Sequence, residues 1–200
     1  MLGVTVAPAV SMVIRWRIEA ELTGFLRRHD KHERAAFQLY TVAVATARDP
    51  YLYHDLGVPD TLDGRFDAIA LHVFLLIHRL NAELDPGPAL AQAVFDAMFL
   101  DMDVNLREMG VGDMSVGKRN RAMWEAFHGR SAAYSTAWGD QPALEAAFAR
   151  NFWRGADPPA GSVVALVRLA LAQSARLAEQ RLDALLRGEV GFLAPKETAR

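Results

Sequence analysis

Hydrophobic residues recur with helical spacing along almost the whole chain. This spacing predicts helices over residues 12–28, 34–48, 65–82, 88–109, 115–138, 141–153 and 161–187. Glycine and proline interrupt the pattern, most densely in the loop from Pro50 to Gly64. No strand-like alternation of useful length occurs. The expected fold is therefore all-α, a single-domain bundle of six to seven helices.

The segment 65–82 carries apolar residues on every face, so it is predicted to be the most buried helix. The next two predicted helices each carry one apolar stripe. These stripes contain Val94, Met98, Met102, Leu106 and Met109, and then Val116, Met123, Trp124, Phe127, Tyr134 and Trp138. We interpret both stripes as core. The alternative is that the methionines form an adaptable binding surface.

Composition narrows the function classes. The chain has 200 residues, 52% hydrophobic and 23% charged, with a net charge of −2, as is typical of a soluble globular protein and not of a nucleic-acid-binding one. Absence of cysteine removes disulfides, thiol nucleophiles and Cys-ligated zinc.

Within one structural domain we expect an N-terminal segment with the first helix (1–33), a core (34–155) and a C-terminal helix packing on that core (156–200). The first fourteen residues are apolar, but the positive charge of Arg15 follows them, whereas a secretory signal has its positive charge first. We expect no membrane-spanning segment. A weak interfacial anchor at the N-terminus is the alternative.

The stretch GVGDMSVGKR, residues 110–119, contains G-x-x-x-x-G-K, the pattern of a phosphate-binding loop without its final Ser or Thr. Arg119 stands where the magnesium-binding hydroxyl belongs, and a predicted helix precedes the stretch where a strand is required. We therefore reject the ATPase interpretation. The stretch is instead predicted to join two antiparallel helices, with Asp113 or Ser115 capping the second one.

Charge is unusual at this junction, because Lys118, Arg119 and Arg121 lie in or near the first turn of a helix, where the helix dipole disfavours cations. Acidic residues at the end of the preceding helix are expected to face these bases, and Asp103 and Arg107 form an i, i+4 pair. The junction is thus either a salt-bridged hairpin or a polar recognition surface, and both can hold. The candidate partner-binding set is Arg65, Asp67, Asp101, Asp103, Arg107, Glu108, Asp113, Lys118, Arg119 and Arg121. Arg65 and Asp67 are included because they are expected to extend this patch.

Two runs resemble the ubiquinol–cytochrome c chaperone family. They are YHDLGVPDTLDGRFDAIALHVFLLIHRL, residues 53–80, and FDAMFLDMDVNLREMGVGDMSVGKRNRAMWEAFHGRSAAY, residues 95–134. The resemblance extends over roughly residues 35–155. It implies a non-enzymatic assembly chaperone for complex III that binds newly made cytochrome b or another subunit of that complex.

The resemblance also leaves open a small partner chaperone. The chain lacks an Arg- and Ser-rich transit peptide, so it looks like a bacterial form, expected in the cytoplasm with a possible peripheral contact at the inner membrane. No catalytic residue, metal, cofactor or nucleic-acid partner is expected.

Two alternatives stay open. One is a small-ligand or haem-binding helical protein with a pocket lined by His72 or His128, and the other is a helical enzyme with an unrecognised site. A closed cavity beside a histidine would favour the ligand-binding alternative, whereas a surface without such a pocket would favour the chaperone.

Overall fold

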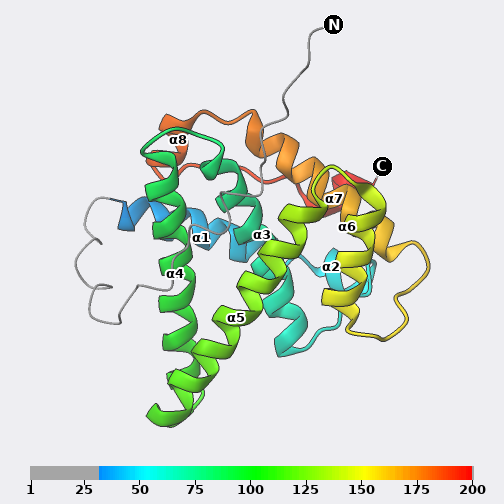
Figure 1. The fold of residues 1–200 in the computed structure, drawn as a ribbon, viewed down its shortest axis with the longest axis horizontal. Coiled ribbons are helices and arrows are strands. Elements are labelled where there is room, and N and C mark those ends of the chain that lie inside the picture. Colours follow the sequence, from blue (N-terminus) through cyan, green and yellow to red (C-terminus); the bar gives the residue numbers. More distant parts are fainter. Residues whose placement is uncertain (1–31, 200) are drawn as a thin grey trace, which may run out of the picture.

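The computed structural model describes residues 32–199, which fold into a helical bundle (Figure 1). The helices are α1 (Glu33–Ala47), α2 (Pro50–His54), α3 (Leu62–Asn81), α4 (Gly87–Glu108), α5 (Asp113–Ala137), α6 (Gln141–Phe148), α7 (Ser162–Ala178) and α8 (Leu182–Leu186). A π-helical turn, η2 (Ala149–Trp153), follows α6, and a 3₁₀ helix, η3 (Pro195–Ala199), ends this part of the chain. Six of the α-helices have eight or more residues and residues 32–199 contain no strand, which confirms the all-α prediction. The helix predicted over 12–28 lies outside the described residues.

Most predicted boundaries agree with the structure to within three residues, but three details differ. The predicted loop from Pro50 to Gly64 contains α2, which Asp49 caps by accepting a hydrogen bond from the Tyr51 amide at 2.9 Å. The helix predicted over 141–153 becomes π-helical after Phe148. The helix predicted over 161–187 is two helices, α7 and α8.

A side chain from α3 ends α7. The Arg79 guanidinium donates from Nε to the Leu177 carbonyl at 3.0 Å and from Nη2 to the Gln180 carbonyl at 2.9 Å. The last carbonyls of a helix have no partner within it, so these donors satisfy acceptors that water would otherwise have to reach. The hydrophobic spacing of residues 161–187 continues through this point, which is why it predicted a single helix.

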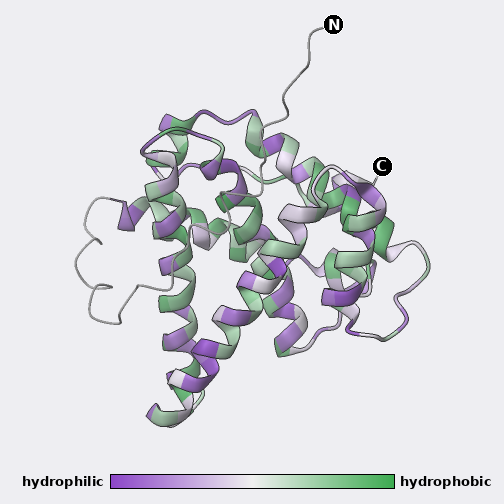
Figure 2. Ribbon diagram, in the orientation of Figure 1, coloured by the Kyte–Doolittle hydropathy of each residue, from purple (hydrophilic) through white to green (hydrophobic). Residues whose placement is uncertain are grey.

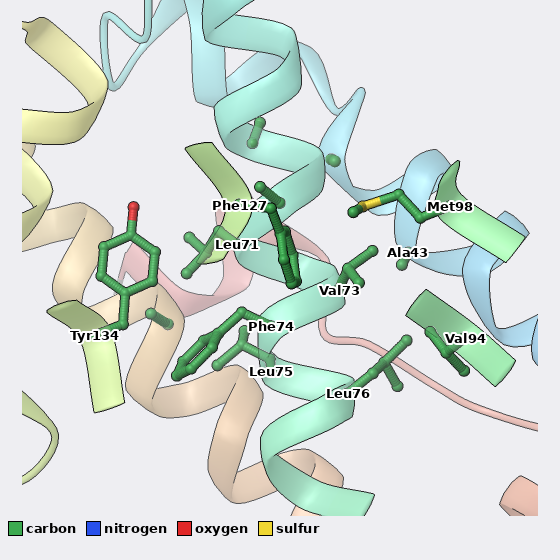
Figure 3. Packing of buried hydrophobic residues seen from close by; sticks show 14 of the residues in the cluster. Ala43, Leu71, Val73, Phe74, Leu75, Leu76, Val94, Met98, Phe127 and Tyr134 are labelled. Carbon is green, nitrogen blue, oxygen red and sulfur yellow. The ribbon is translucent and has the colours of Figure 1, made fainter. Parts of the chain in front are cut away.

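The central element is α3, which packs against α1, α4, α5 and α7. Figure 3 shows Val73 and Leu76 on the side of α3 that faces α1 and α4, while Phe74 lies beside Tyr134 of α5. The rings of Phe74 and Tyr134 meet edge to face, with centroids 5.5 Å apart. Buried residues lie all around α3, as predicted.

Candidate partner-binding surface

The ends of α4 and α5, with the turn between them, form an arm that projects from the bundle (residues 100–125, the arm; Figure 1). The turn is a Schellman motif, in which the Val111 amide donates to Leu106 O at 3.1 Å and the Gly110 amide donates to Arg107 O at 2.9 Å. Gly110 takes φ = +77°, the left-handed conformation that this motif requires. The turn is therefore specified by its own backbone hydrogen bonds.

Polar side chains fix the two helices of the arm to each other. Asp103 accepts hydrogen bonds from Arg107 Nε and from Asn120 Nδ2, each at 2.6 Å, so it joins α4 to α5. Arg107 also donates from Nη1 to Asp113 Oδ1 at 2.5 Å. The hydrogen bond from Arg107 lowers the pKa of the Asp103 carboxyl, and the same bond raises the pKa of Arg107. These groups are largely exposed, so they orient the arm more than they stabilise it.

The predicted pairing of the acids of α4 with the bases of α5 is wrong, whereas the predicted i, i+4 pair of Asp103 with Arg107 is confirmed. Across the hairpin, Asp103 meets Asn120 and no base. Arg121 pairs with Glu125 of its own helix at 3.0 Å, and Asp101 accepts a hydrogen bond from Tyr40 of α1 at 2.7 Å. The expected cap is wrong as well, because Gly112 occupies the N-cap position and Asp113 is already helical.

Three exposed charged residues of the arm have side chains without a partner in the described chain. The side chains of Glu108, Lys118 and Arg119 make no hydrogen bond or ion pair with any residue between 32 and 199. The cations lie in the second turn of α5, after Asp113 in its first turn, and no carboxylate of the described chain pairs with them. An acidic or polar group from another molecule could pair with them.

Exposed apolar side chains accompany these charges. At the turn, Met109 is 56% exposed and Met114 is 96% exposed. Farther along α5, Trp124 is 42% exposed and stacks on His128 with ring centroids 3.9 Å apart. Figure 2 shows polar residues along the arm and apolar ones at its tip. The arm thus offers methionine, tryptophan and arginine side chains, which are enriched at protein interfaces, together with the unpaired cation of Lys118.

The prediction that these apolar residues belong to the core is right for some of them and wrong for others. The core interpretation holds for Met98, Met102, Phe127 and Tyr134, which are buried, whereas it is wrong for Met109 and Trp124. Met114 was not singled out. Its signal was its position, since it falls off the stripe of α5 that runs from Val116 through Phe127.

The expected extension of the patch by Arg65 and Asp67 is not found. Arg65 pairs with Asp60 at 2.6 Å in the segment that leads into α3. Asp67 is fully buried, with its carboxylate 2.6 Å from Arg130 Nη2 and 2.9 Å from Arg154 Nη2. Asp67 therefore joins α3 to α5 and to the residue after η2, and it cannot touch a partner directly.

The resemblance to a phosphate loop is accidental. Residues 113–118 are the first turns of α5, and the segment before the turn is the helix α4. The pattern therefore folds as helix where a phosphate loop would wrap its backbone amides around an anion.

Neither His72 nor His128 lines either of the two grooves described below. His72 is completely buried, and its Nδ1 donates to the Ala68 carbonyl at 2.8 Å, which leaves Nε2 enclosed in the core. His128 donates from Nδ1 to the Trp124 carbonyl at 3.0 Å. Two open grooves indent residues 32–199 most clearly, one between α5 and α6 and one between α1 and α4, and no histidine lines either. Within the same residues no group of three His, Asp or Glu side chains is placed to hold a metal ion.

Fold and surface together define a class of protein, a helical bundle that presents a projecting, mixed apolar and charged arm. The chain belongs to the ubiquinol–cytochrome c chaperone family, whose model matches residues 54–192. This match includes α3, α4 and α5 and hence the whole arm.

Two known proteins place the chain more closely. It is 34% identical to the Cbp3 homolog from Brucella abortus, whose crystal structure superposes with a TM-score of 0.74 over 88% of this chain and 98% of that one. It is 26% identical over 118 residues to ubiquinol–cytochrome-c reductase complex assembly factor 1 of Xenopus laevis, an alignment that spans 58% of this chain and 59% of the relative. The shared fold is thus supported by a structure of similar length, whereas the match to the curated relative covers little more than half of either chain.

None of the helices in residues 32–199 is both long enough and apolar enough to cross a bilayer.

Proposed function

We propose that this protein is a non-catalytic chaperone for assembly of ubiquinol–cytochrome c reductase, and that it holds the cytochrome b subunit before that subunit is incorporated. The observation that carries the proposal is the family match over residues 54–192, which contains the whole arm. The relative from Xenopus laevis is named as an assembly factor of the same complex.

The arm is the surface we assign to this task. A chaperone that holds a subunit needs a surface that accepts apolar side chains of varying shape and polar contacts that fix orientation. Met109 and Met114 supply the first, because the unbranched thioether adapts to irregular surfaces. Lys118 and Arg119 supply the second, because they are exposed cations without an intramolecular partner among residues 32–199. The ion pairs of Arg107 with Asp103 and Asp113 hold the ends of α4 and α5 together, and so they position the methionines relative to the cations.

The ligand-binding alternative has less support. It required a closed cavity beside a histidine, whereas the two grooves described above are open and contain none. A small second chaperone and a peripheral contact with the inner membrane belong to the same proposal. The arm is one surface to which such a partner could bind.

Deleting the gene tests the function itself. We expect the amount of assembled complex, measured as quinol–cytochrome c reductase activity in isolated membranes, to fall and to recover when the gene is restored. Normal activity in the deletion strain would overturn the proposed function.

Charge reversal tests the arm. The double variant Lys118→Glu, Arg119→Glu should weaken co-purification of cytochrome b by roughly tenfold, because repulsion replaces attraction at the edge of an interface. The matched control is Arg168→Glu, Lys196→Glu, which reverses one arginine and one lysine that are both exposed elsewhere. Circular dichroism must show unchanged helicity in both variants. Equal recovery of cytochrome b with both would remove the arm from the proposal while leaving the assembly role intact.

A further inference from the structure

The groove between α1 and α4 lies outside the arm and is unusually apolar for an exposed surface. It has a volume of about 520 Å³ and is lined by Glu33, Arg34, Phe37, Gln38, Ala93, Asp96, Ala97 and Leu100. Phe37 and Leu100 are each 52% exposed, and they approach it from opposite walls. Single exposed apolar residues are common, but a contiguous apolar strip between two helices indicates that something packs there.

The α4 wall of this groove continues as a straight stripe. Ala93, Ala97, Leu100 and Val104 follow one another at spacings of four, three and four residues, and Val104 is 45% exposed. The eleven steps from Ala93 to Val104 rise about 16 Å, so the stripe is about three turns long. It is long enough to accept one helical segment lengthwise.

The chain itself contains a segment of matching length and chemistry. In the stretch 12–28, Ile14, Ile18, Leu22 and Phe25 fall on one face of a helix, and they extend over twelve residues. Thr23 falls on the opposite face together with Met12 and Trp16, and Glu19 falls at the border between the two faces. The face that carries Ile14 therefore equals the apolar stripe of α4 in length.

Connectivity favours this occupant over another molecule. The described chain starts at His32, and the next residue, Glu33, lines the groove. Four residues separate position 28 from His32, a reach of up to about 14 Å. A tether this short gives an effective concentration on the order of millimolar, which a free partner seldom reaches.

We propose that residues 12–28 bind as a helix in the α1–α4 groove of the same molecule, with the face of Ile14, Ile18, Leu22 and Phe25 toward the groove, and cover Phe37 and Leu100. This proposal does not depend on the function proposed above. It makes the groove an intramolecular docking site, which any client or partner must compete to occupy.

Engineered cysteines test the proposal in the full chain, because the natural sequence has no cysteine to interfere. Leu100→Cys is combined with Ile18→Cys or Leu22→Cys, and in the matched controls with Trp16→Cys or Thr23→Cys. A disulfide needs Cα atoms within about 7 Å, so only the apolar-face pairs should oxidise to a cross-linked monomer. Cross-linked dimers would assign the groove to a second copy and overturn the proposal, as would equal cross-linking of both sets.

Hydrogen exchange supplies a second, independent readout. In the full-length protein, amides of residues 12–28 should be protected, and Leu100→Arg should abolish this protection. Leu171→Arg is the matched control, since Leu171 is a partly exposed leucine on α7 (38%), away from the groove. Unprotected residues 12–28 in the unmodified protein, or equal protection in both variants, would overturn the proposal.

Discussion

At the scale of single residues, Asp67 is the charge most tightly built into the fold. Burial raises the pKa of its carboxyl, and the nearby guanidinium groups, that of Arg130 first, oppose this rise. Arg130 is itself nearly buried, and its guanidinium lies 5.3 Å from the centre of the Phe66 ring. Arg154 reaches the same carboxylate from a left-handed backbone conformation with φ = 51°, which non-glycine residues rarely adopt. Three segments of the chain therefore depend on one carboxylate.

Replacing Asp67 by Ala should lower the free energy of unfolding by about 3–5 kcal/mol, because it leaves the Arg130 charge buried without its partner. Urea denaturation followed by circular dichroism measures this loss. Asp60→Ala is the control, since it removes an aspartate paired with arginine on the surface, and it should leave the free energy nearly unchanged. A small decrease in the free energy of unfolding for both variants would show that the fold does not depend on the Asp67 carboxylate.

At the scale of elements, the arm depends on one glycine for its turn, although it contains several. Gly110 ends α4 in the left-handed conformation, whereas Gly117 lies inside α5, is exposed and has no φ that requires glycine. An added methyl group would meet no atom within 4 Å at either site. Substitutions at the two positions therefore differ only in the backbone conformation that alanine must adopt, and not in steric clashes.

Substituting alanine at these two positions should change stability in opposite directions. Gly110→Ala should destabilise by about 1–2 kcal/mol, because alanine is disfavoured at positive φ. Gly117→Ala should stabilise by about 0.5–1 kcal/mol, because it lowers the entropy cost of forming the helix. Thermal unfolding of both variants beside the wild type provides the measurement. A stabilising Gly110→Ala would mean that the Schellman turn is absent in solution.

An element could be predicted when nearby residues determine it, and could not when a residue distant in the sequence does. Helix positions come from local periodicity and from breakers such as Gly110, and most helix boundaries were predicted to within three residues. The end of α7 depends on Arg79, nearly a hundred residues earlier in the chain, so no local pattern could reveal it.

The partner of Asp103 could not be predicted without knowing which face α5 turns toward α4. Charge counting favoured a base, but helical geometry places Asn120 there. Met114 shows the same limit. Its apolar side chain suggests a buried position, whereas its place on the helix exposes it to solvent.

At the scale of the whole molecule, four helices share α3 as their common support, and His72 lies in its buried middle. Its Nδ1–H is satisfied by the Ala68 carbonyl, while its Nε2 has no hydrogen-bond partner and an edge of the ring faces Phe192 at 5.5 Å. Protonating Nε2 would place an unpaired positive charge in the core. The imidazole is therefore neutral in the folded protein, and its titration is coupled to unfolding of the bundle.

Acid should therefore destabilise the protein in a defined pH window. Burial lowers the pKa of His72 to about 4, from 6.5 in the unfolded chain. Between these values the unfolded state binds a proton that the folded state excludes, so the stability is fully present above pH 6.5 and is lost as the pH falls toward 4. The loss amounts to about 3 kcal/mol. Burial lowers the pKa of His78 and of His128 as well, which adds to the same trend.

Urea denaturation between pH 4 and 7 should show that the free energy of unfolding depends steeply on pH in the wild type and in the control His54→Gln, whose histidine is exposed. His72→Leu should flatten the slope, and an unchanged slope in that variant would show that the buried imidazole does not control acid unfolding.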